Sequence, residues 1–538
     1  MSAGERLLRD AADSGTLVDL NDHSETDRIV RPEVIAALLL VTGRDDSRQV
    51  SAVRLAGAVI PGELNLEHAQ IRRPLMLRSC RFANPIRLNY AQAQSVDLRE
   101  SHFPRLLADG MCVSGNLDLR DAVAGIQLVP GAVNHFMHRS AVRAVGARID
   151  GDLYAGGISV TGELLLVGTD VGGVVTLRYA RLNNAGGVAV QAGGLRIRRG
   201  LLMSHMLAQG EVRLPGVRIG GVMRLEDAEI RHPRGCAVSA EALVTESDVF
   251  AERLRAEGCV LLEGARIGGS LHLEGATLSG PGSGEAAISA SRMIIGRSLY
   301  LSESFFADGD MQFIGMQVNG HLDMIGMRPT HGVLDLRGVR VGDVRDTFEA
   351  WPVQVDLDGF TYDSLSRQVS AKKRLTLLAR QQGQTPADRY RPQPYEQLAA
   401  FHRALGNDAE ARTVLLAKQR ARRHTQPWLR RAPGYFLDAL VGYGYRPLRA
   451  VIWAALLMIV GSFYFAHVHP TATGPGPLAP YNPVLYTADQ LIPVAQFGQQ
   501  GAWHVHGAAE CAAVALTACG WSLGIAIAAA VTRTVTRS

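Results

Sequence analysis

The chain is poor in cysteine, in aromatic residues and in net charge. Six cysteines in 538 residues are too few for a fold held together by disulfides. A hydrophobic fraction of 47% excludes an intrinsically disordered protein. Lys+Arg 56 against Asp+Glu 51 leave a formal charge of +5, so the sequence predicts neither an acidic mimic of DNA nor a nucleic-acid-binding protein.

Sequence signatures of catalysis and of cofactor binding are also missing. No G-x-G-x-x-G opens a helix, and the chain has no phosphate-binding loop, no H-E-x-x-H zinc helix, no G-x-S-x-G elbow and no C-x-x-C pair. We therefore predict no cofactor, and we expect packed thiols rather than redox centres. The cysteines are Cys80, Cys112, Cys236 and Cys259 in a repeat region, and Cys511 and Cys519 in an apolar segment near the C-terminus.

The chain is rich in glycine, with 57 residues, and it has an eleven-residue repeat between positions 51 and 343. The pattern I-x-G-x-L-x-L-x-x-A-x-[IL] occurs at 60–71, 219–230 and 267–278. Its L-x-L alternation is the period of a strand with one buried face, whereas a helix would need apolar residues three and four apart. The repeat predicts a mainly β protein with a β-helix over residues 51–362, in which glycine or a small residue turns the corners.

Two repeat units would form one coil of about 22 residues in this β-helix. At a strand spacing of 4.7–4.9 Å, about 13 stacked coils would make a rod roughly 60 Å long. The insertion at 279–285 interrupts the period and predicts an external loop.

A solenoid needs caps, because its terminal coils would otherwise expose core and strand edges. Residues 1–50 are predicted to cap the first coil, with a helix over 26–40, and 353–362 to form a last irregular coil. Residues 363–431 are predicted to be a helical adaptor, in which 394–417 has the spacing of a tetratricopeptide-type helix hairpin. Such a hairpin either binds a peptide or joins the rod to the next segment, and we favour the joining role.

The C-terminal region, 432–538, is predicted to be a two-span membrane anchor. Residues 450–468 contain no Asp, Glu, Lys or Arg, and nineteen helical residues cover about 28 Å, the thickness of a bilayer core. A second apolar segment, 511–532, is rich in alanine and glycine, which suits close helix packing in lipid.

Positive charge predicts the orientation of these spans. The outer loop 467–507 has no Lys or Arg, whereas basic residues precede the first span and follow the second. By the positive-inside rule we expect both termini in the cytoplasm and the protein in the plasma membrane. The basic residues before the first span are predicted to contact anionic lipid headgroups. They are Lys418, Arg420, Arg422, Arg423, Arg430 and Arg431.

Two His-x-His pairs flank the outer loop. His467 and His469 follow the first span, and His504 and His506 precede the second. In extended chain, residues two apart point the same way, so each pair is able to present two imidazoles to one metal ion. The alternative is that the four histidines are polar caps at the water-facing ends of the spans.

The L-x-L and A-x-[IL] units resemble a diverged pentapeptide repeat, a resemblance that implies a right-handed, four-sided β-helix. The whole chain resembles a group of bacterial, especially actinobacterial, proteins with such repeats and two C-terminal spans. Further marks of that group are Gly-Tyr-Gly-Tyr-Arg-Pro at 442–447, the segment 491–499 and Gly-Trp at 520–521. Proteins of this group are often labelled membrane-associated oxidoreductases, and the resemblance carries no catalytic residues with it.

Our leading hypothesis from sequence is a membrane-anchored, cytoplasm-facing β-helix that acts as a scaffold or protein-interaction module, without catalysis. Its partners would be the bilayer and an unidentified protein, and a homo-oligomer stays open. One alternative is the oxidoreductase that the resemblance implies. A second is a channel-like protein, because two spans with an intervening loop are typical of simple channel subunits, although no T-V-G-Y-G filter is present.

Overall fold

The structure is a computed structural model, and it describes residues 1–40, 52–125, 140–282, 285–328, 331–365, 370–425, 447–473, 480–492 and 494–535. Two compact units divide the chain. The first contains residues 1–369 and 380–382, and the second contains 370–379 and 383–538. Arg430 and Arg431 lie outside the described residues.

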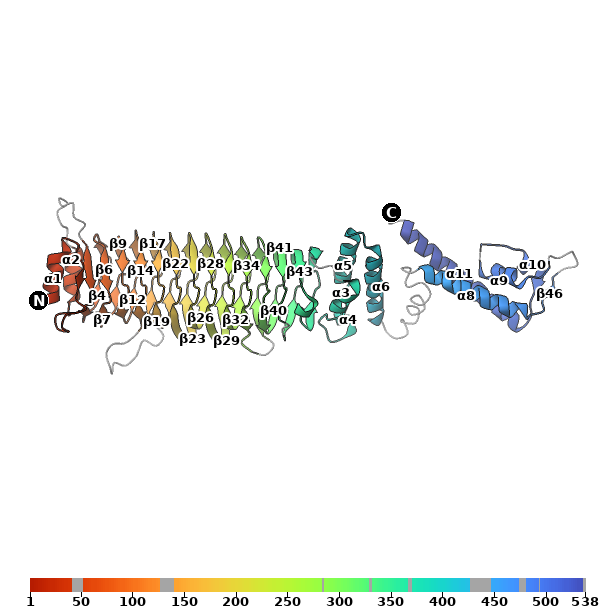
Figure 1. The fold of residues 1–538 in the computed structure, drawn as a ribbon, viewed down its shortest axis with the longest axis horizontal. Coiled ribbons are helices and arrows are strands. Elements are labelled where there is room, and N and C mark those ends of the chain that lie inside the picture. Colours follow the sequence, from red (N-terminus) through yellow and green to blue (C-terminus); the bar gives the residue numbers. More distant parts are fainter. Residues whose placement is uncertain are drawn as a thin grey trace. The chain divides into compact units, whose positions relative to one another are not determined.

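The first unit is a β-solenoid of about 13 turns over residues 53–365 (Figure 1). Every strand pair in it is parallel, and in the first coils the chain runs through four short strands each. Register partners such as Gln70 and Gln92, or Val53 and Leu75, are one coil apart. The predicted β-helix, its 22-residue coil and its number of turns are therefore confirmed.

The strands stack into four ladders, which we number in chain order through the coil. The first contains β5 (Gln70–Ile71), β9 (Gln92–Ala93), β13 (Cys112–Val113), β17 (Arg148–Ile149), β21 (Asp170–Val171), β24 (Arg196–Ile197), β27 (Arg218–Ile219), β30 (Val244–Thr245), β33 (Arg266–Ile267) and β37 (Ile294–Ile295). The second contains β1 (Val18–Asp19), β2 (Val53–Ala56), β6 (Leu75–Arg78), β10 (Val96–Asp97), β14 (Leu117–Asp118), β18 (Leu153–Tyr154), β22 (Val174–Thr176), β25 (Gly200–Leu202), β28 (Met223–Arg224), β31 (Val249–Phe250), β34 (Leu271–His272) and β38 (Leu299–Tyr300). Both continue in β41 (Gln317–Asp323), β43 (Arg340–Arg345) and β45 (Thr361–Leu365).

The other two ladders share some long strands. The third contains β3 (Val59–Ile60), β7 (Arg81–Phe82), β11 (His102–Phe103), β15 (Val123–Ala124), β19 (Ser159–Thr161), β35 (Thr277–Ser279) and β39 (Phe306–Asp308). The fourth contains β4 (Leu64–Asn65), β8 (Ile86–Arg87), β12 (Leu106–Leu107), β16 (Val142–Arg143), β20 (Leu164–Leu165), β36 (Ala286–Ser289), β40 (Asp310–Gln312), β42 (Val333–Asp335) and β44 (Gln354–Asp356). Between them, β23 (Arg181–Gln191), β26 (Leu207–Arg213), β29 (Glu229–Ser239) and β32 (Arg255–Leu261) belong to both.

The core follows directly from the L-x-L pattern. In each unit the two apolar residues point inward, as Leu64 and Leu66 do, and both are fully buried. The alanine of the pattern is buried as well, for example Ala276 beside Leu278. The interior is therefore a narrow, continuous stack of aliphatic side chains, with Phe82 and Phe103 as larger fillers.

The expectation that glycine or a small residue turns the corners is only half right. Two corners of each coil hold a residue with positive φ, and many of these residues are not glycine: Tyr90 (φ 57°), Tyr179 (φ 59°) and Arg253 (φ 55°) are examples. A non-glycine residue in this region costs about 1–2 kcal/mol. The interior packing and the hydrogen bonds between coils hold these corners in place.

Glycine is required instead where one coil approaches the next. At the corner between the first and second ladders, a Cβ on Gly221 would lie 1.8 Å from the carbonyl oxygen of Arg199 in the preceding coil. Gly168 stands at a left-handed corner (φ +65°), and a Cβ added there would meet no other group within 4 Å. The glycine of the I-x-G motif therefore lies where two neighbouring coils are in close contact.

We predict that Gly221→Ala destabilises the full chain more than Gly168→Ala. The second change costs only backbone strain, about 1–2 kcal/mol. The first pushes two coils apart, at a cost of about 3 kcal/mol. Urea unfolding followed by far-ultraviolet circular dichroism measures the order, and equal midpoints for the two variants would contradict this account of the motif.

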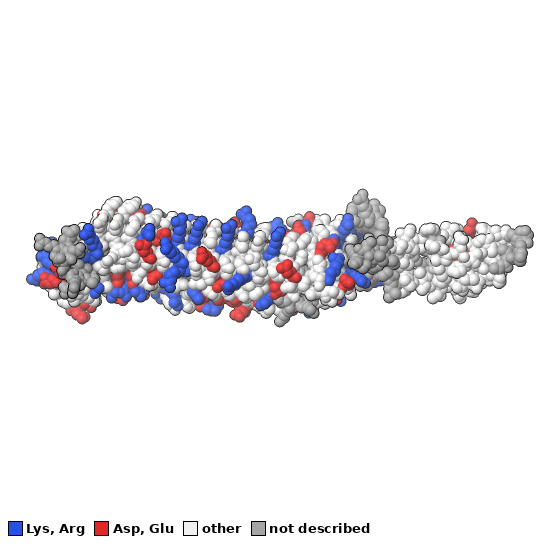
Figure 2. All heavy atoms as spheres, turned by 90° about the horizontal axis from the view of Figure 1, so that it is seen from above, with Lys and Arg blue, Asp and Glu red and all other residues white. Residues whose placement is uncertain are grey.

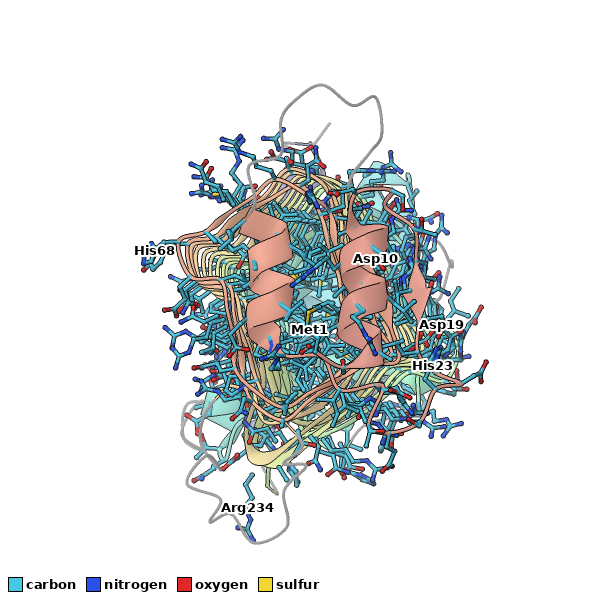
Figure 3. All side chains as sticks on the ribbon, turned by 90° about the vertical axis from the view of Figure 1, so that its left-hand side faces the viewer. Met1, Asp10, Asp19, His23, His68 and Arg234 are labelled. Atoms are coloured by element: carbon cyan, nitrogen blue, oxygen red, sulfur yellow. A yellow bond between two sulfur atoms is a disulfide. The ribbon has the colours of Figure 1, made fainter. Side chains whose placement is uncertain are left out.

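Two helices cover the N-terminal end of the rod, α1 (Ala3–Ala12) and α2 (Pro32–Leu40), as Figure 3 shows. The sequence predicts α2 but not α1. Ser2 and Glu5 form a capping box on α1, and Glu5 also binds the Arg31 guanidinium at 2.8 Å. The Arg31 hydrogen bond lowers the pKa of Glu5 to about 2, so this link between the two helices is present above pH 4.5 and is lost as the pH falls toward 2.

The other end of the rod is closed by irregular chain. After η1 (Phe348–Ala350), the indole of Trp351 donates a hydrogen bond to buried Asp346. The backbone N–H groups of Leu357 and Gln382 bind the Gln381 side chain and the Val355 carbonyl at 3.2 and 2.8 Å. Residues 380–382 therefore return to the last coils and cover their strand edge.

One expectation about the cysteines is wrong. Cys236 and Cys259 are register partners on β29 and β32 and form a disulfide, so they are not two packed thiols. Cys80 does fit the expectation, because it is fully buried, and its burial raises the pKa of the thiol to about 12. Cys112 is an exposed free thiol on the rod.

The second unit is helical. Its first part contains α3 (Ala371–Leu378), α4 (Pro386–Arg389), α5 (Pro392–Ala404) and α6 (Asp408–His424), and α5 packs on α6 as the predicted hairpin requires. Its second part contains α8 (Pro447–Ala466), β46 (Thr471–Ala472), α9 (Pro483–Leu491), α10 (Gln499–Ala502), β47 (Trp503–His504) and α11 (Ala508–Val535). In α8 and α11, the windows 449–466 and 508–525 are long and apolar enough to cross a membrane, and only 17% and 28% of them are buried.

Candidate interaction surface and membrane segment

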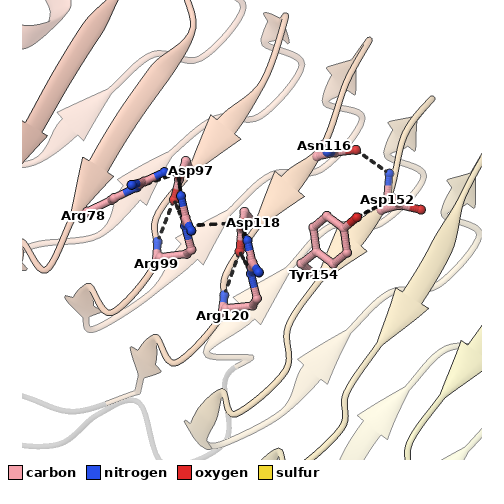
Figure 4. Close-up of polar contacts among 8 residues, drawn as sticks. All are labelled: Arg78, Asp97, Arg99, Asn116, Asp118, Arg120, Asp152 and Tyr154. Atoms are coloured by element: carbon pink, nitrogen blue, oxygen red, sulfur yellow. Dashed lines mark hydrogen bonds and ion pairs between the residues drawn. The ribbon is translucent and has the colours of Figure 1, made fainter. Parts of the chain in front are cut away.

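The outward-pointing residues of the second ladder, with the corner residues two positions further on, form one continuous column that we call the second-ladder face. Figure 4 shows its N-terminal half. Arg78 and Arg99 both bind Asp97 at 2.8 Å, and Arg99 also reaches Asp118 at 3.4 Å. Arg120 closes the row on Asp118 at 2.5 Å.

This row arises from the repeat itself. In Asp-Leu-Arg, the leucine points into the core, so the acid and the base two residues apart point outward together. Stacking then places each pair beside the pair of the next coil. Burial raises the pKa of the Asp97 carboxyl, and the Arg78 guanidinium opposes that rise. Each half-buried carboxylate in this row thus has at least one arginine partner.

The row ends at Tyr154, whose ring lies 5.0 Å from the Arg120 guanidinium carbon. The Tyr154 hydroxyl donates to Asp152 at 2.6 Å, and the Asp152 backbone N–H donates to the Asn116 side-chain oxygen at 2.8 Å (Figure 4). The bond to Asn116 links this coil to the preceding one, whereas the bond between Tyr154 and Asp152 lies within one coil. This half of the face neutralises itself and has the character of an inter-coil brace.

Further along the same face the ion pairs give way to stacked rings. His272 lies between Phe250 and Tyr300, with ring centroids 5.0 and 4.7 Å away. His321 follows edge-on to Tyr300 and bonds its hydroxyl at 3.1 Å. Burial lowers the pKa of His321. Offset stacking of rings at this separation is worth about 0.5–1.5 kcal/mol per pair, so this part of the face is also a brace between coils.

A different arrangement occurs on the first ladder. Arg196 and Arg218 are register partners in adjacent coils, and Arg198 and Arg199 follow Arg196 at the corner. All four are exposed, and among the described residues none of them forms an ion pair with a carboxylate. We call these four residues the arginine patch. Figure 2 shows rows of basic side chains crossing the rod.

Mutual repulsion of the positive charges destabilises the arginine patch when no anion is bound to it. Two like charges about 5 Å apart in water repel by nearly 1 kcal/mol. Asp170, the register partner of Arg196 in the preceding coil, supplies one acid against these four bases. The guanidinium group presents five donors that match carboxylate oxygens. Its chemistry therefore suits an anionic ligand from outside the chain.

The candidate membrane segment, residues 447–535 of the second unit, has a short helix between its two long apolar ones. The α9 helix contacts both α8 and α11, and glycine allows this. A Cβ on Gly461 would lie 2.6 Å from the Thr487 methyl group, and one on Gly520 would lie 2.1 Å from the Leu491 carbonyl oxygen. In the sequence Gly520 is only a mark of resemblance, and the structure supplies its physical reason.

Polar groups on α9 organise the chain that follows it. The buried carboxylate of Asp489 accepts hydrogen bonds from the backbone N–H groups of Phe497, Gln499 and Gln500. Gln490 accepts a 2.6 Å bond from Thr517 on α11. Buried backbone needs such partners where water is scarce, so α9 and its following loop form a built structure.

The structure brings only part of the predicted histidine cluster together. The rings of His504 and His506 have centroids 4.9 Å apart, and β47 pairs with β46, which follows the first histidine pair. His467 Nδ1 lies 2.8 Å from the Phe463 carbonyl oxygen, and His506 Nε2 lies 2.9 Å from the Thr471 hydroxyl. His469 follows His467 in the chain before β46. Metal binding by these four residues stays a prediction.

The predicted lipid-contact residues that the structure describes lie on α6 and differ among themselves. Lys418 forms an ion pair with Glu396 of α5, and Arg423 is buried. Arg420 is half-buried and Arg422 is exposed. Lys418 therefore serves the α5–α6 packing, and lipid contact of the set stays a prediction.

Sequence reasoning missed the two features that shape the rod surface. The Asp-Leu-Arg units at 97–99, 118–120 and 335–337 were readable, because their acid and base have the same spacing as L-x-L. The arginine patch could not be predicted from the sequence as a cluster, because Arg196 and Arg218 become neighbours only when the coil between them closes. The same is true of Cys236 and Cys259.

Comparison of the chain with protein-family models, with curated proteins and with solved structures finds no match.

We predict that Gly520→Ala displaces α9, because the new methyl group would meet the Leu491 carbonyl. The measurement is oxidative cross-linking of Gln490→Cys to Thr517→Cys, two positions whose side chains are in contact, in the full chain in detergent. The cross-link yield should fall several-fold with Gly520→Ala. Gly501→Ala, where a Cβ has open space, is the matched control, and an equal yield in both variants would mean that Gly520 does not set the position of α9.

Proposed function

We propose that this protein is a membrane-anchored scaffold whose rod binds an acidic segment of a partner protein through the arginine patch. The observation that carries the proposal is the contrast between two faces of the same rod. Along the second-ladder face, Arg99 and Arg120 bind carboxylates of their own chain, whereas Arg196 and Arg218 bind none among the residues described. A rigid rod with a row of guanidinium groups that form no ion pair among the described residues fits partner binding better than catalysis.

The anchor is proposed to be a pair of transmembrane helices. Ile459 and Phe463 on α8, and Val514 and Ile525 on α11, are each at least 65% exposed. Apolar surface of this extent needs lipid or protein cover. The basic segment before α8 and the lysine- and arginine-free loop support a plasma-membrane protein with both termini and the rod in the cytoplasm.

The orientation is testable with a native reporter. Cys112 is exposed on the rod and Cys80 is buried; Cys511 and Cys519 are replaced by alanine, and so are Cys236 and Cys259, which would be thiols in a reducing compartment. With the rod in the cytoplasm, a membrane-impermeant maleimide should label Cys112 only after cells are permeabilised, and Cys112→Ser should remove that label. Labelling of Cys112 in intact cells would place the rod outside and overturn the orientation.

The arginine patch is testable by site-specific photo-cross-linking in native membranes. A photoreactive residue at position 198 should capture one discrete protein with an acidic segment, and the adduct should be lost with Arg196→Gln/Arg199→Gln/Arg218→Gln. Arg181→Gln/Arg255→Gln removes two exposed arginines from the third ladder and should leave the adduct unchanged. No discrete adduct, or equal loss in both variants, would contradict a partner site at the arginine patch.

A channel-like role is the second candidate, and the packing of α9 against both long helices favours it. A short helix between two spans, followed by a loop tied by Asp489, is compatible with a homo-oligomer that lines a path with the α9 loops. Ion flux through liposomes containing the full chain would support this role. The oxidoreductase alternative rests on the resemblance alone, and a flavin, haem or nicotinamide signature in the purified protein would support it.

A further inference from the structure

One group on the second-ladder face contains two carboxylates and a single imidazole, so that one negative charge remains even when His272 and Glu274 form an ion pair. Glu252, His272 and Glu274 lie on two consecutive coils, and one ligand atom from each lies within 4.8 Å of the other two. His272 Nδ1 is 3.0 Å from Glu274 Oε1. Among the described residues, these three side chains form the group of His, Cys, Asp or Glu that lies close enough together to share one metal ion.

Two carboxylate oxygens in this group are buried without a partner. Glu252 Oε2 and Glu274 Oε2 have no hydrogen-bond donor among the described residues, although both atoms are shielded from solvent. An unsatisfied buried polar atom costs about 1–3 kcal/mol, and more when it is charged. Since Glu252 and Glu274 also occupy the same position in adjacent coils, their charges repel each other. The arrangement therefore calls for a cation.

The neighbouring arginines do not provide that cation. Arg224 binds Glu226 at 2.6 Å, and its guanidinium carbon lies 4.6 Å from the Phe250 ring centroid. Arg253, next to Glu252 in sequence, makes a two-bond ion pair with Asp227 at 2.7 Å. The basic groups beside the cluster are thus engaged with other acids.

Glu226, one coil earlier in the same column, has the hydrogen-bond partners that the Oε2 atoms of Glu252 and Glu274 lack. It binds Arg224 and also accepts a 2.6 Å hydrogen bond from the Ser204 hydroxyl.

We propose that Glu252, His272 and Glu274 bind one divalent transition-metal ion, with Zn²⁺ as the ion that best fits one imidazole and two carboxylates. Zinc sites commonly use three such protein ligands and leave a further position for water. Stacking between Phe250 and Tyr300 holds the His272 ring in place before the ion arrives. The ion would replace the missing donors and link the Glu252 coil to the next.

The test uses the full chain in detergent, stripped with a chelator and titrated with Zn²⁺ against a chromophoric competitor. To separate this site from the predicted histidine site, the titration is made in His467→Ala/His469→Ala/His504→Ala/His506→Ala. We expect one Zn²⁺ per chain in that background, and at least 100-fold weaker binding after Glu252→Gln/Glu274→Gln. Glu226→Gln, in the same column, should bind as the background does.

A second measurement guards against a folding defect in the double variant. Zn²⁺ should raise the midpoint of thermal unfolding of the rod in the background chain and in Glu226→Gln, and should leave it unchanged in Glu252→Gln/Glu274→Gln. The metal-free midpoint of the double variant should be no lower than that of the background, because the repulsion between the two carboxylates is removed. The proposal is overturned if the background chain binds no Zn²⁺, or if Glu252→Gln/Glu274→Gln binds it as tightly as Glu226→Gln does.

Discussion

Stacking of coils at the spacing of parallel strands is the constraint on which the rest of the rod depends. Each coil gives its backbone hydrogen bonds to the next, so a side chain that points outward in one coil lies about 4.8 Å from its equivalent in the neighbouring one. The surface is therefore a set of columns, and every charge in a column meets a neighbour. An acid above an arginine stabilises the stack, as with Asp97 and Arg78, and like charges in sequence along a column destabilise it.

Much of the rod followed from local sequence, because its period is local. The alternation of Leu64 and Leu66 indicates which face of the strand is buried, and the eleven-residue repeat indicates where the chain turns. Contacts that form only when a coil closes could not be predicted from the local sequence. Cys236 meets Cys259, and Glu252 meets Glu274, only at one particular length of the coil between them, and inserted residues change that length from one coil to the next. The left-handed corners at Tyr90 and Arg253 were likewise hidden, since they depend on interior packing that overrides local preference.

The C-terminal helices satisfy the same requirement for hydrogen-bonded backbone groups by different means. Apolar composition located α8 and α11, but it contained no signal for α9 between them, because α9 is held by groups far away in the sequence. Gly520 provides room for the Leu491 carbonyl, and Asp489 binds the backbone of the loop that follows. The roles of Gly520 and Asp489 can therefore be recognised only from the contacts that they make in the folded chain.

The disulfide and the charge pattern make opposite demands on the compartment of the rod. Disulfides persist where the environment is oxidising and are rare in the cytoplasm, whereas the basic segment before α8 favours a cytoplasmic rod. Register alone brings Cys236 and Cys259 together, and parallel stacking would hold the two residues adjacent as thiols as well. The bond is therefore not needed to form the coil, and the oxidation state of this pair in cells reports the compartment independently of any label placed at Cys112.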